Sequence, residues 1–487
     1  MPRLVLTPLI ALALLLGSGL PAHATELELA NAAFEQWKDG LPVGWSKSIG
    51  ARRNPGDTPG RVVQLGKDGV ALVGDAKTNE WPLLSQRVTA SSGAFLELQY
   101  TARVLGAKRE PGQFGSCYVG FILRDVDGKP AGFTVSNVTS TDWSDGAVRL
   151  KLPAGTANVD VAFFLSQTGR LEVARMRLRE RPASESFDIL VSEMDRHYPF
   201  FAMHGIDWQQ VGHRHRAAAT KATTAEEFVA AIQPMLAELK DGHVWIEAPD
   251  GTKTWTWTPK VHTNFELQPL LGRLQDVKQV IRNVISATTP EGYGYLAIGT
   301  MQLTPAQYGA IESAFKAHFV RPGIVLDLRV NGGGAEVWGQ RLCSLLTKEQ
   351  VLYGRSKLRG GPKHDNLIAG GVRHVTPAKA GHYEGPVVAL IGPGCVSSGE
   401  GMAMMLKAIP GIPLVGLPTR GSSGNPQPVH LANDVRVWFS RWISLLPDGS
   451  GIERTGVAPD VRIEHLTGKD PALDEAVKIL KAKAGKR

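Results

Sequence analysis

Residues 387–400 read VVALIGPGCVSSGE, an apolar segment followed by small residues and the start of a new element. Five consecutive apolar residues are typical of a buried strand, and the Gly-Pro-Gly after them predicts a turn that leads into a helix. A serine in the first turn of a helix keeps its hydroxyl exposed, and free backbone N–H groups lie beside it. The stretch therefore indicates a nucleophile at Ser397, with Ser398 as the rival position.

A second apolar run, Ile324–Val330, ends in Asn331 and three glycines. Unhindered backbone amides at such a point can stabilise a developing oxyanion. We expect the N–H groups of Ser398 and of Gly332 or Gly333 to form this oxyanion hole. By itself the glycine run favours a tight turn with positive φ. Neither a Gly-Lys-Ser/Thr ending nor Gly-x-Gly-x-x-Gly spacing is present, which argues against nucleotide binding.

Two further segments complete a pattern of four blocks: LKDGH at residues 239–243 and GIERTGVAPD at residues 451–460. In this order and spacing the four segments resemble the motif blocks of the S41 peptidases, which include the C-terminal processing peptidases and the tricorn core protease. The resemblance covers residues 185 to 468. It implies the ββα spiral shared with the Clp protease and crotonase superfamily.

The resemblance also implies roles for individual residues. Ser397 lies three positions before Glu400, as the nucleophile does in the Ser-x-x-Glu block, and His243 in the first block is the implied base. Processing peptidases use instead a lysine in a Thr-x-Gly-Lys block, and Ser422 occupies that position in the segment PTRGS. This departure favours the tricorn-like branch, in which serine and histidine act with a supporting glutamate. Glu453 matches that glutamate.

The position before the implied base departs from the tricorn-like pattern as well. Those enzymes place a second serine there as a relay between imidazole and carboxylate, whereas this chain has Gly242. Two hypotheses follow: Glu453 supports His243 directly or through water, or Asp241 orients the ring. Because Ser422 has no role in either hypothesis, its replacement by alanine is expected to have little effect on hydrolysis.

Composition sets the outer limits. The chain has 487 residues, 43% of them apolar and 21% charged, which is enough for two or three hydrophobic cores. The formal net charge of +8 comes from scattered basic residues, so a solvated surface is favoured over a nucleic-acid groove. The three cysteines are far apart in sequence, and a packed thiol is preferred at Cys395. The dispersed histidines and the absence of His-Glu-x-x-His predict no metal and no cofactor.

The organisation of the chain follows from changes in hydrophobic period. An apolar run after Arg3 and the segment Ala22-His23-Ala24 are typical of a cleavable signal peptide, so an exported protein is expected, periplasmic or extracellular, with no membrane span. We predict five parts: a signal peptide at residues 1–24, an all-β, jelly-roll-like sandwich at 25–182, a helical subdomain carrying the base at 183–250, an α/β catalytic domain with parallel core strands at 251–468, and a C-terminal helix and basic tail at 469–487.

The expected sandwich resembles galactose-binding-like modules through its opening segment, NAAFEQW at residues 31–37 followed by PVGW at 42–45. That resemblance implies a glycan or protein ligand. Trp37, Trp45, Trp81 and Trp143 could line a ligand face, but core packing is the preferred interpretation. In the catalytic domain, Trp255 and Trp257 share one face of a short strand and are candidates for lining a substrate groove.

The combined interpretation is an exported serine peptidase that cleaves peptides or proteins without a cofactor. Ser397 attacks, His243 moves the proton and Glu453 supports the imidazole. Two alternatives stay open on the same site. One is a binding protein whose incomplete relay has left a ligand pocket, and the other is an acyl hydrolase acting on esters.

Overall fold

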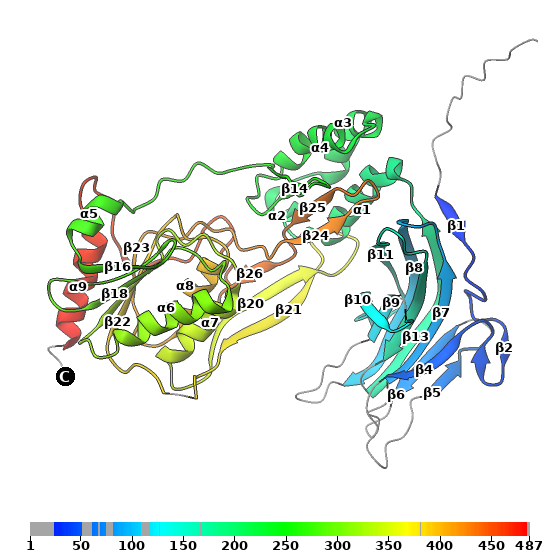
Figure 1. The fold of residues 1–487 in the computed structure, drawn as a ribbon, viewed down its shortest axis with the longest axis horizontal. Coiled ribbons are helices and arrows are strands. Elements are labelled where there is room, and N and C mark those ends of the chain that lie inside the picture. Colours follow the sequence, from blue (N-terminus) through cyan, green and yellow to red (C-terminus); the bar gives the residue numbers. More distant parts are fainter. Residues whose placement is uncertain are drawn as a thin grey trace, which may run out of the picture. The chain divides into compact units, whose positions relative to one another are not determined.

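The computed structural model describes residues 24–50, 61–66, 69–74, 81–108, 117–125, 127–165, 168–379 and 381–484 (Figure 1). Its contacts divide the chain into two units: one runs to Ser186 and includes His430–Asn433, and the other holds Phe187–Val429 and Asp434–Arg487. The predicted signal peptide lies outside the described residues except for Ala24. No helix among the described residues is long and apolar enough to cross a bilayer.

The first unit is a sandwich of two antiparallel sheets, which confirms the all-β prediction. The larger sheet has the order β11-β8-β13-β6-β5 with β1 added on β13, and comprises β1 (Thr25–Leu27), β5 (Arg61–Gln64), β6 (Val70–Gly74), β8 (Phe95–Lys108), β11 (Ser144–Lys151) and β13 (Thr168–Glu180). The smaller sheet has the order β10-β9-β12-β7-β4, with β4 (Ser46–Gly50), β7 (Trp81–Thr89), β9 (Cys117–Arg124), β10 (Pro130–Asn137) and β12 (Asn158–Leu165). A two-stranded ribbon of β2 (Trp37–Lys38) and β3 (Leu41–Pro42) completes the described part.

The inner faces of the two sheets enclose one apolar core. Alternate residues of β12 point into it, as period-two patterning predicts. Trp45 is buried against Phe34 and Phe163, with ring centroids 5.2 and 5.4 Å away, so the core interpretation is confirmed for this tryptophan. Trp143 is instead exposed beneath the guanidinium of Arg103. The side chain of Trp81 lies outside the described residues.

A helical segment opens the second unit, as the 3.6-residue period predicts. It contains α1 (Ser186–His197), α2 (Phe201–His204), α3 (Trp208–Lys221) and α4 (Ala225–Ala237), whereas the short η1 (Ala183–Glu185) before it still belongs to the first unit. Thr224 caps α4 by accepting a hydrogen bond from the Glu227 N–H, and the Glu227 carboxylate accepts one from the Thr223 N–H. The chain after α4 leads directly to the predicted base.

A seven-stranded mixed sheet forms the centre of the second unit. Its order is β16-β17-β18-β19-β22-β23-β27, with β16 (Gln275–Ile281), β17 (Val284–Thr288), β18 (Gly294–Ile298), β19 (Ile324–Asp327), β22 (Val387–Ile391), β23 (Leu414–Gly416) and β27 (Val461–Arg462). The strands from β18 to β27 are parallel, which confirms the predicted parallel core.

Successive residues of β19 and β22 point alternately into two apolar cores, one on each face of this sheet. Helices cover both faces and enclose these cores. On one face lie α6 (Pro305–Ala317), α7 (Glu336–Cys343), η2 (Ser344–Leu346) and α8 (Ser398–Ala408), and on the other lie α5 (Leu267–Gly272) and α9 (Pro471–Ala484), drawn in red in Figure 1. Two smaller sheets have the orders β15-β14-β25-β24 and β21-β20-β26, with β14 (Trp245–Glu247), β15 (Lys253–Trp255), β20 (Val351–Arg359), β21 (Leu367–Val375), β24 (Gln427–His430), β25 (Arg436–Phe439) and β26 (Ile443–Leu445).

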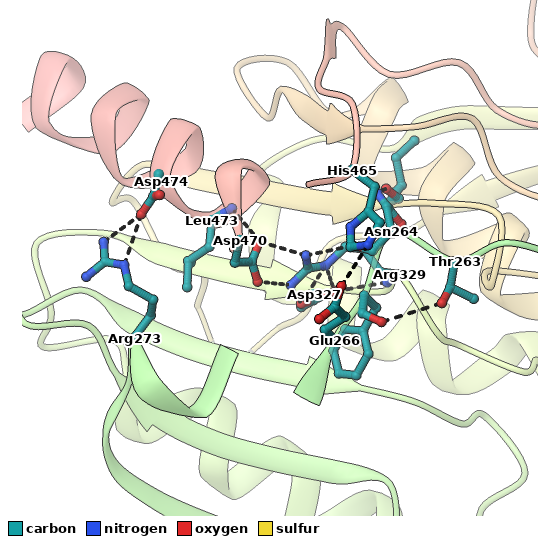
Figure 2. Close-up of polar contacts among 12 residues, drawn as sticks. Thr263, Asn264, Glu266, Arg273, Asp327, Arg329, His465, Asp470, Leu473 and Asp474 are labelled. Atoms are coloured by element: carbon teal, nitrogen blue, oxygen red, sulfur yellow. Dashed lines mark hydrogen bonds and ion pairs between the residues drawn. The ribbon is translucent and has the colours of Figure 1, made fainter. Parts of the chain in front are cut away.

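A buried ion-pair cluster joins the end of β19 to the start of α9 (Figure 2). The Arg329 guanidinium binds Asp327 at 2.6 Å and Asp470 at 2.8 Å, and both of its pairs lie in the interior. Its Nη1 also donates to the Asn264 carbonyl. Arg329 thus joins two carboxylates, Asp327 two residues before it and Asp470 141 residues after it.

Candidate active site

Ser397 stands at the N-cap of α8, just after the turn that follows β22. Its φ of 59° is unusual for a residue with a side chain, and strain of this kind is found at catalytic positions more often than elsewhere. The conformation is held by the neighbouring loop: a Cβ added to Gly333 would lie 2.7 Å from the Ser397 Cβ. Gly333 itself has a φ of 83°, so only glycine suits this close approach.

The predicted base lies on the turn after α4 and contacts a serine from another loop. The His243 Nδ1 is 2.7 Å from the Ser422 Oγ. The Ser422 carbonyl accepts a hydrogen bond from the Ser397 N–H at 2.9 Å. Ser422 therefore contacts both the predicted nucleophile and the predicted base. Because it binds the Nδ1 of His243, the Nε2 is the ring nitrogen that takes no part in this contact.

Burial affects the chemistry of His243. The side chain is buried, and this desolvation is the main cause that lowers its pKa below the usual value, with a further contribution from the nearby Arg420. The Asp241 carboxylate opposes the shift. A histidine with a lowered pKa is neutral at pH 7, which is the form that can accept a proton from a serine.

The loop that carries Ser422 is wrapped around a fully buried carboxylate. Glu400 accepts hydrogen bonds from the Thr419 hydroxyl and the Gly421 N–H, both at 2.6 Å, and from the Ser422 N–H at 2.8 Å. Burial raises the Glu400 pKa, while these donors lower it in part. The glutamate of the Ser-x-x-Glu block thus positions the residue that contacts His243.

Gly242 lies close to the Ser422 hydroxyl. A Cβ at residue 242 would lie 3.8 Å from the Ser422 Oγ. A serine before the histidine and a serine at position 422 would therefore direct their hydroxyls to the same region. The sequence alone indicated no role for Ser422, so its replacement by alanine was expected to have little effect. The hydrogen bond of Ser422 to His243 removes the basis of that expectation. The sequence signal for this contact is the combination of glycine at position 242 with serine at position 422, where processing peptidases have lysine.

Glu453 makes no direct hydrogen bond to His243 among the described residues, so the direct contact of the first hypothesis is not formed. Its polar neighbour is His204, whose Nε2 is 3.8 Å from the Glu453 Oε1. Burial, together with the charges of Asp241 and Glu400, raises the Glu453 pKa to about 9. The group is therefore a neutral acid near pH 7, so it offers no negative charge to an imidazolium.

Asp241 holds the turn rather than the ring. Its Oδ1 accepts the backbone N–H of His243 at 2.8 Å, and its Oδ2 accepts the hydroxyls of Tyr198 and Ser440 at 3.1 and 2.8 Å. Both carboxylate oxygens are thus committed within the interior. Asp241 fixes the backbone from which His243 projects, and the contact to the imidazole that the second hypothesis required is not formed.

Two of the three predicted oxyanion donors are engaged elsewhere. The Gly332 N–H donates to the Gly299 carbonyl at 3.0 Å, and the Gly333 N–H donates to the Asn331 side chain at 2.9 Å. The Ser398 N–H is at the first position of α8, where no intrahelical acceptor exists. The prediction for Gly332 and Gly333 is therefore wrong, because both N–H groups already have acceptors, and the role of the Ser398 N–H stays a prediction.

Gly334 offers a replacement for these donors. Its carbonyl accepts a hydrogen bond from the Ser398 Oγ at 2.5 Å, so the two residues lie side by side. The bridge between this loop and Met301 uses the Gly333 carbonyl and the Ala335 N–H. The N–H of Gly334 is not part of that bridge, which makes it a candidate for the second oxyanion donor.

The predicted site residues line one cavity of about 1350 Å³ in the second unit. Its wall includes Ser397, His243, Glu453, Ser422 and several tryptophans. Trp255 and Trp257 line it, as the groove prediction proposed, and Trp255 is 53% exposed. Trp245 lies between Trp255 and Trp438, with both ring centroids 5.2 Å away. The wall beside the serine is therefore both aromatic and accessible.

Family comparisons match two separate parts of the chain. The family model described as peptidase family S41 matches residues 292–463, and the tricorn protease C1 domain matches residues 181–237. No curated protein sequence matches the chain.

Three solved structures are similar to parts of this chain. A candidate peptidase from Parabacteroides merdae is 23% identical, with a TM-score of 0.54 over 63% of this chain and 99% of that one, so the two share a fold. A lipoprotein from Streptococcus agalactiae is 15% identical, with a TM-score of 0.44 over 62% of this chain and 97% of its own. A structure described as CBM4 is 13% identical, with a TM-score of 0.25 over 32% of this chain and 100% of its own.

Proposed function

Because the chain is a member of peptidase family S41, a family of serine hydrolases, we propose that it is an exported serine peptidase with Ser397 as nucleophile and His243 as base. The observation that carries this proposal is the double contact of Ser422. Its carbonyl accepts the N–H of the nucleophile, and its hydroxyl lies 2.7 Å from the Nδ1 of the base.

The proposed first step is attack on the peptide carbonyl. With Nδ1–H donating to the Ser422 hydroxyl, the His243 Nε2 carries the lone pair and accepts the proton of Ser397 as its Oγ bonds to carbon. The developing oxyanion accepts hydrogen bonds from the Ser398 and Gly334 N–H groups. His243 then gives its proton to the leaving amine as the C–N bond breaks, which leaves an ester on Ser397.

The second step releases the acid product. Water gives one proton to the His243 Nε2 and attacks the ester carbonyl, and the proton then returns to the Ser397 Oγ. In this scheme Ser422 takes the part of the relay serine that position 242 lacks. Glu453 acts as a neutral group that shapes the pocket. The ring orientation thus depends on a hydroxyl instead of a carboxylate.

Two further parts of the proposal rest on the sequence. Export rests on the signal-like segment at residues 1–24, and it predicts a mature chain that starts at Thr25. A glycan or protein ligand for the sandwich is carried over from its resemblance to galactose-binding-like modules. Neither part affects the chemistry assigned to Ser397 and His243.

The test is covalent labelling of the purified protein with a fluorophosphonate, read by intact mass and peptide mapping. We expect one label on Ser397, none in Ser397→Ala, and labelling slower by about 100- to 10,000-fold in His243→Ala, since general-base catalysis contributes on this scale. Ser398→Ala is the matched control, because it removes a hydroxyl from the rival position and keeps the backbone N–H.

Other labelling results would change the residue assigned as nucleophile or the proposed function. A label on Ser398 would move the nucleophile by one residue, and no label on folded protein would favour the binding protein. For labelled protein, matched ester and amide substrates separate an acyl hydrolase from a peptidase, because ester cleavage needs less protonation of the leaving group.

A further inference from the structure

Three basic side chains line the cavity that holds Ser397: Lys240, Arg420 and Arg454. None of them forms an ion pair with a carboxylate among the described residues. Arg420 donates through its Nε to the Pro393 carbonyl at 3.2 Å, and its side chain makes no other hydrogen bond among the described residues. The cavity therefore presents cationic groups that the folded chain does not neutralise by direct contact.

The carboxyl groups that line the same cavity are hydrogen-bonded, ion-paired or neutral. Asp241 uses both oxygens within the protein. Glu336 accepts the Tyr353 hydroxyl at 2.8 Å and pairs with Arg373 at 2.9 Å. Glu453 is held neutral near pH 7 by its raised pKa of about 9. Three cations without an ion pair therefore outnumber Asp241, the one lining carboxylate among the described residues that stays charged and has no cationic partner, and the lining is positive overall.

Two of the cations flank the loop that joins the nucleophile to the base. Arg420 precedes Gly421 and Ser422 in sequence, and the Arg454 N–H donates to the Gly421 carbonyl at 2.7 Å. Arg454 has a φ of 61°, a conformation that costs energy for a residue with a side chain. The backbones of both arginines thus adjoin the loop that carries Ser422, and both residues line the cavity.

Burial adds to the argument for Arg420. Desolvation is the main cause that lowers its pKa from the ordinary arginine value. A guanidinium that is partly removed from water without an ion-pair partner loses solvation that only an anion would restore. Planar guanidinium groups bind carboxylates through two parallel hydrogen bonds, which makes them the side chains best suited to that anion.

We propose that this cavity selects peptide substrates by a carboxylate that binds to Arg420 and Arg454, with apolar neighbours of that group against the tryptophan wall. This inference rests on the proposed peptidase function and adds its substrate class. The carboxylate can come from an acidic side chain or from the C-terminus of the peptide, because the guanidinium groups recognise the same chemistry in both.

Four matched peptide pools test the inference. Each pool is a randomised heptapeptide with either Glu or Gln fixed at the central position and either a free acid or an amide at the C-terminus. Binding to Ser397→Ala, which cannot turn over, is followed by tryptophan fluorescence, and cleavage by the wild type is followed by mass spectrometry. We expect at least one acidic pool to bind about ten times more tightly than its neutral partner, the usual scale for one charged hydrogen bond.

The two sources of the carboxylate separate within this design. A preference for Glu over Gln assigns an acidic side chain, and a preference for acid over amide assigns the peptide C-terminus. In Arg420→Gln and Arg454→Gln, each added to Ser397→Ala, the preference should shrink towards equality, and Arg420→Lys should recover part of it by restoring charge. Arg462→Gln is the control, because Arg462 is exposed and pairs with Glu464.

The outcome also separates this inference from the proposed function. Equal binding of all four pools, with Ser397 still labelled by fluorophosphonate, would overturn the acidic substrate class and leave the peptidase intact. A clear acidic preference in a protein that takes no label would overturn the peptidase and keep the anion-binding cavity. An unchanged preference in both Gln variants, with folding verified by circular dichroism, would refute the role of the arginines.

Discussion

A single hydroxyl distinguishes this site from both catalytic schemes that its motifs resemble. Ser422 stands where a processing peptidase has its lysine, yet it cannot act as a base, because a serine hydroxyl is a poor proton acceptor at neutral pH. We propose that its contact with the His243 Nδ1 orients the ring. In this proposal the two departures from the family pattern, at positions 242 and 422, compensate for each other.

The first prediction concerns that hydroxyl. Ser422→Ala should lower kcat/KM and the rate of fluorophosphonate labelling by about 10- to 100-fold, because the imidazole loses the partner that fixes its tautomer, although the general base itself remains. Ser450→Ala, in an exposed turn, is the control and should behave as the wild type. A Ser422→Ala variant with unchanged labelling would mean that the ring is held by other contacts.

The second prediction concerns the acidity of the base. Because burial lowers the His243 pKa below 6.5, the acid limb of kcat/KM against pH should lie below that value. Arg420→Gln removes one of the causes, so its acid limb should move upward toward the ordinary histidine value. A pH–rate profile of fluorophosphonate labelling measures both, and an acid limb above 6.5 in the wild type would contradict the assignment.

At the scale of elements, the site depends on two strand ends that meet. The loop after β19 and the N-terminus of α8 touch so closely that no side chain fits between them. This contact sets the conformation of Ser397 and the direction of the Ser398 N–H. Gly333→Ala would place its Cβ 2.7 Å from the Ser397 Cβ and 2.9 Å from the Val396 carbonyl, at a φ of 83°.

We therefore expect Gly333→Ala to abolish labelling and to cost about 1–3 kcal/mol in the free energy of unfolding, since strained backbone and a backbone clash combine. Gly309→Ala is a matched control within α6, where an added Cβ meets nothing within 4 Å. There the change should be neutral or stabilising by up to about 1 kcal/mol, because alanine favours helix. Equal losses in the two variants, by denaturant unfolding, would contradict this account of the loop contact.

The elements were easier to predict from the sequence than the site. Buried parallel strands produce continuous apolar runs, so β19 and β22 could be located from residues 324–330 and 387–391. The partner of His243 could not, because it lies 179 residues away in the chain. The oxyanion donors were misassigned for a related reason: a glycine run indicates close approach, but acceptors such as the Gly299 carbonyl decide which N–H is free.

At the scale of the whole second unit, the C-terminal helix is tied to the sheet through Arg329. This guanidinium is buried between Asp327 and Asp470, so removal of either carboxylate leaves a charge that is only partly compensated. Asp470→Asn should lower the free energy of unfolding of this unit by about 3–5 kcal/mol and increase hydrogen exchange in α9.

Asp474 supplies the matched control for that change, because it also pairs with an arginine but at the surface. Asp474→Asn should cost less than about 1 kcal/mol, the usual value for an exposed ion pair. Amide hydrogen exchange of α9 in both variants tests the difference. Similar exchange in the two would show that Arg329 does not anchor the helix.

A buried carboxyl that is neutral when the protein is folded makes the stability of the whole unit depend on pH. The Glu453 pKa is about 9 in the folded state and 4.5 in the ordinary case, so the unfolded chain releases this proton first as pH rises. The folded state therefore binds more protons between these values, and its stability falls as pH rises. Below 4.5 both states are protonated and the contribution is constant.

The cleanest window for this effect is pH 6.5 to 9. His204, the polar neighbour of Glu453, has its pKa lowered from 6.5 to about 4 by burial, so above pH 6.5 it is mostly neutral in both states and adds little slope. Glu453→Gln keeps the neutral shape and removes the titration. Denaturant midpoints should therefore fall less steeply with pH in this variant than in the wild type, whereas the exposed Glu464→Gln should follow the wild type. Parallel curves for Glu453→Gln and the wild type would mean that Glu453 is ionised in the folded protein, and its role as a charged support for the site would then return.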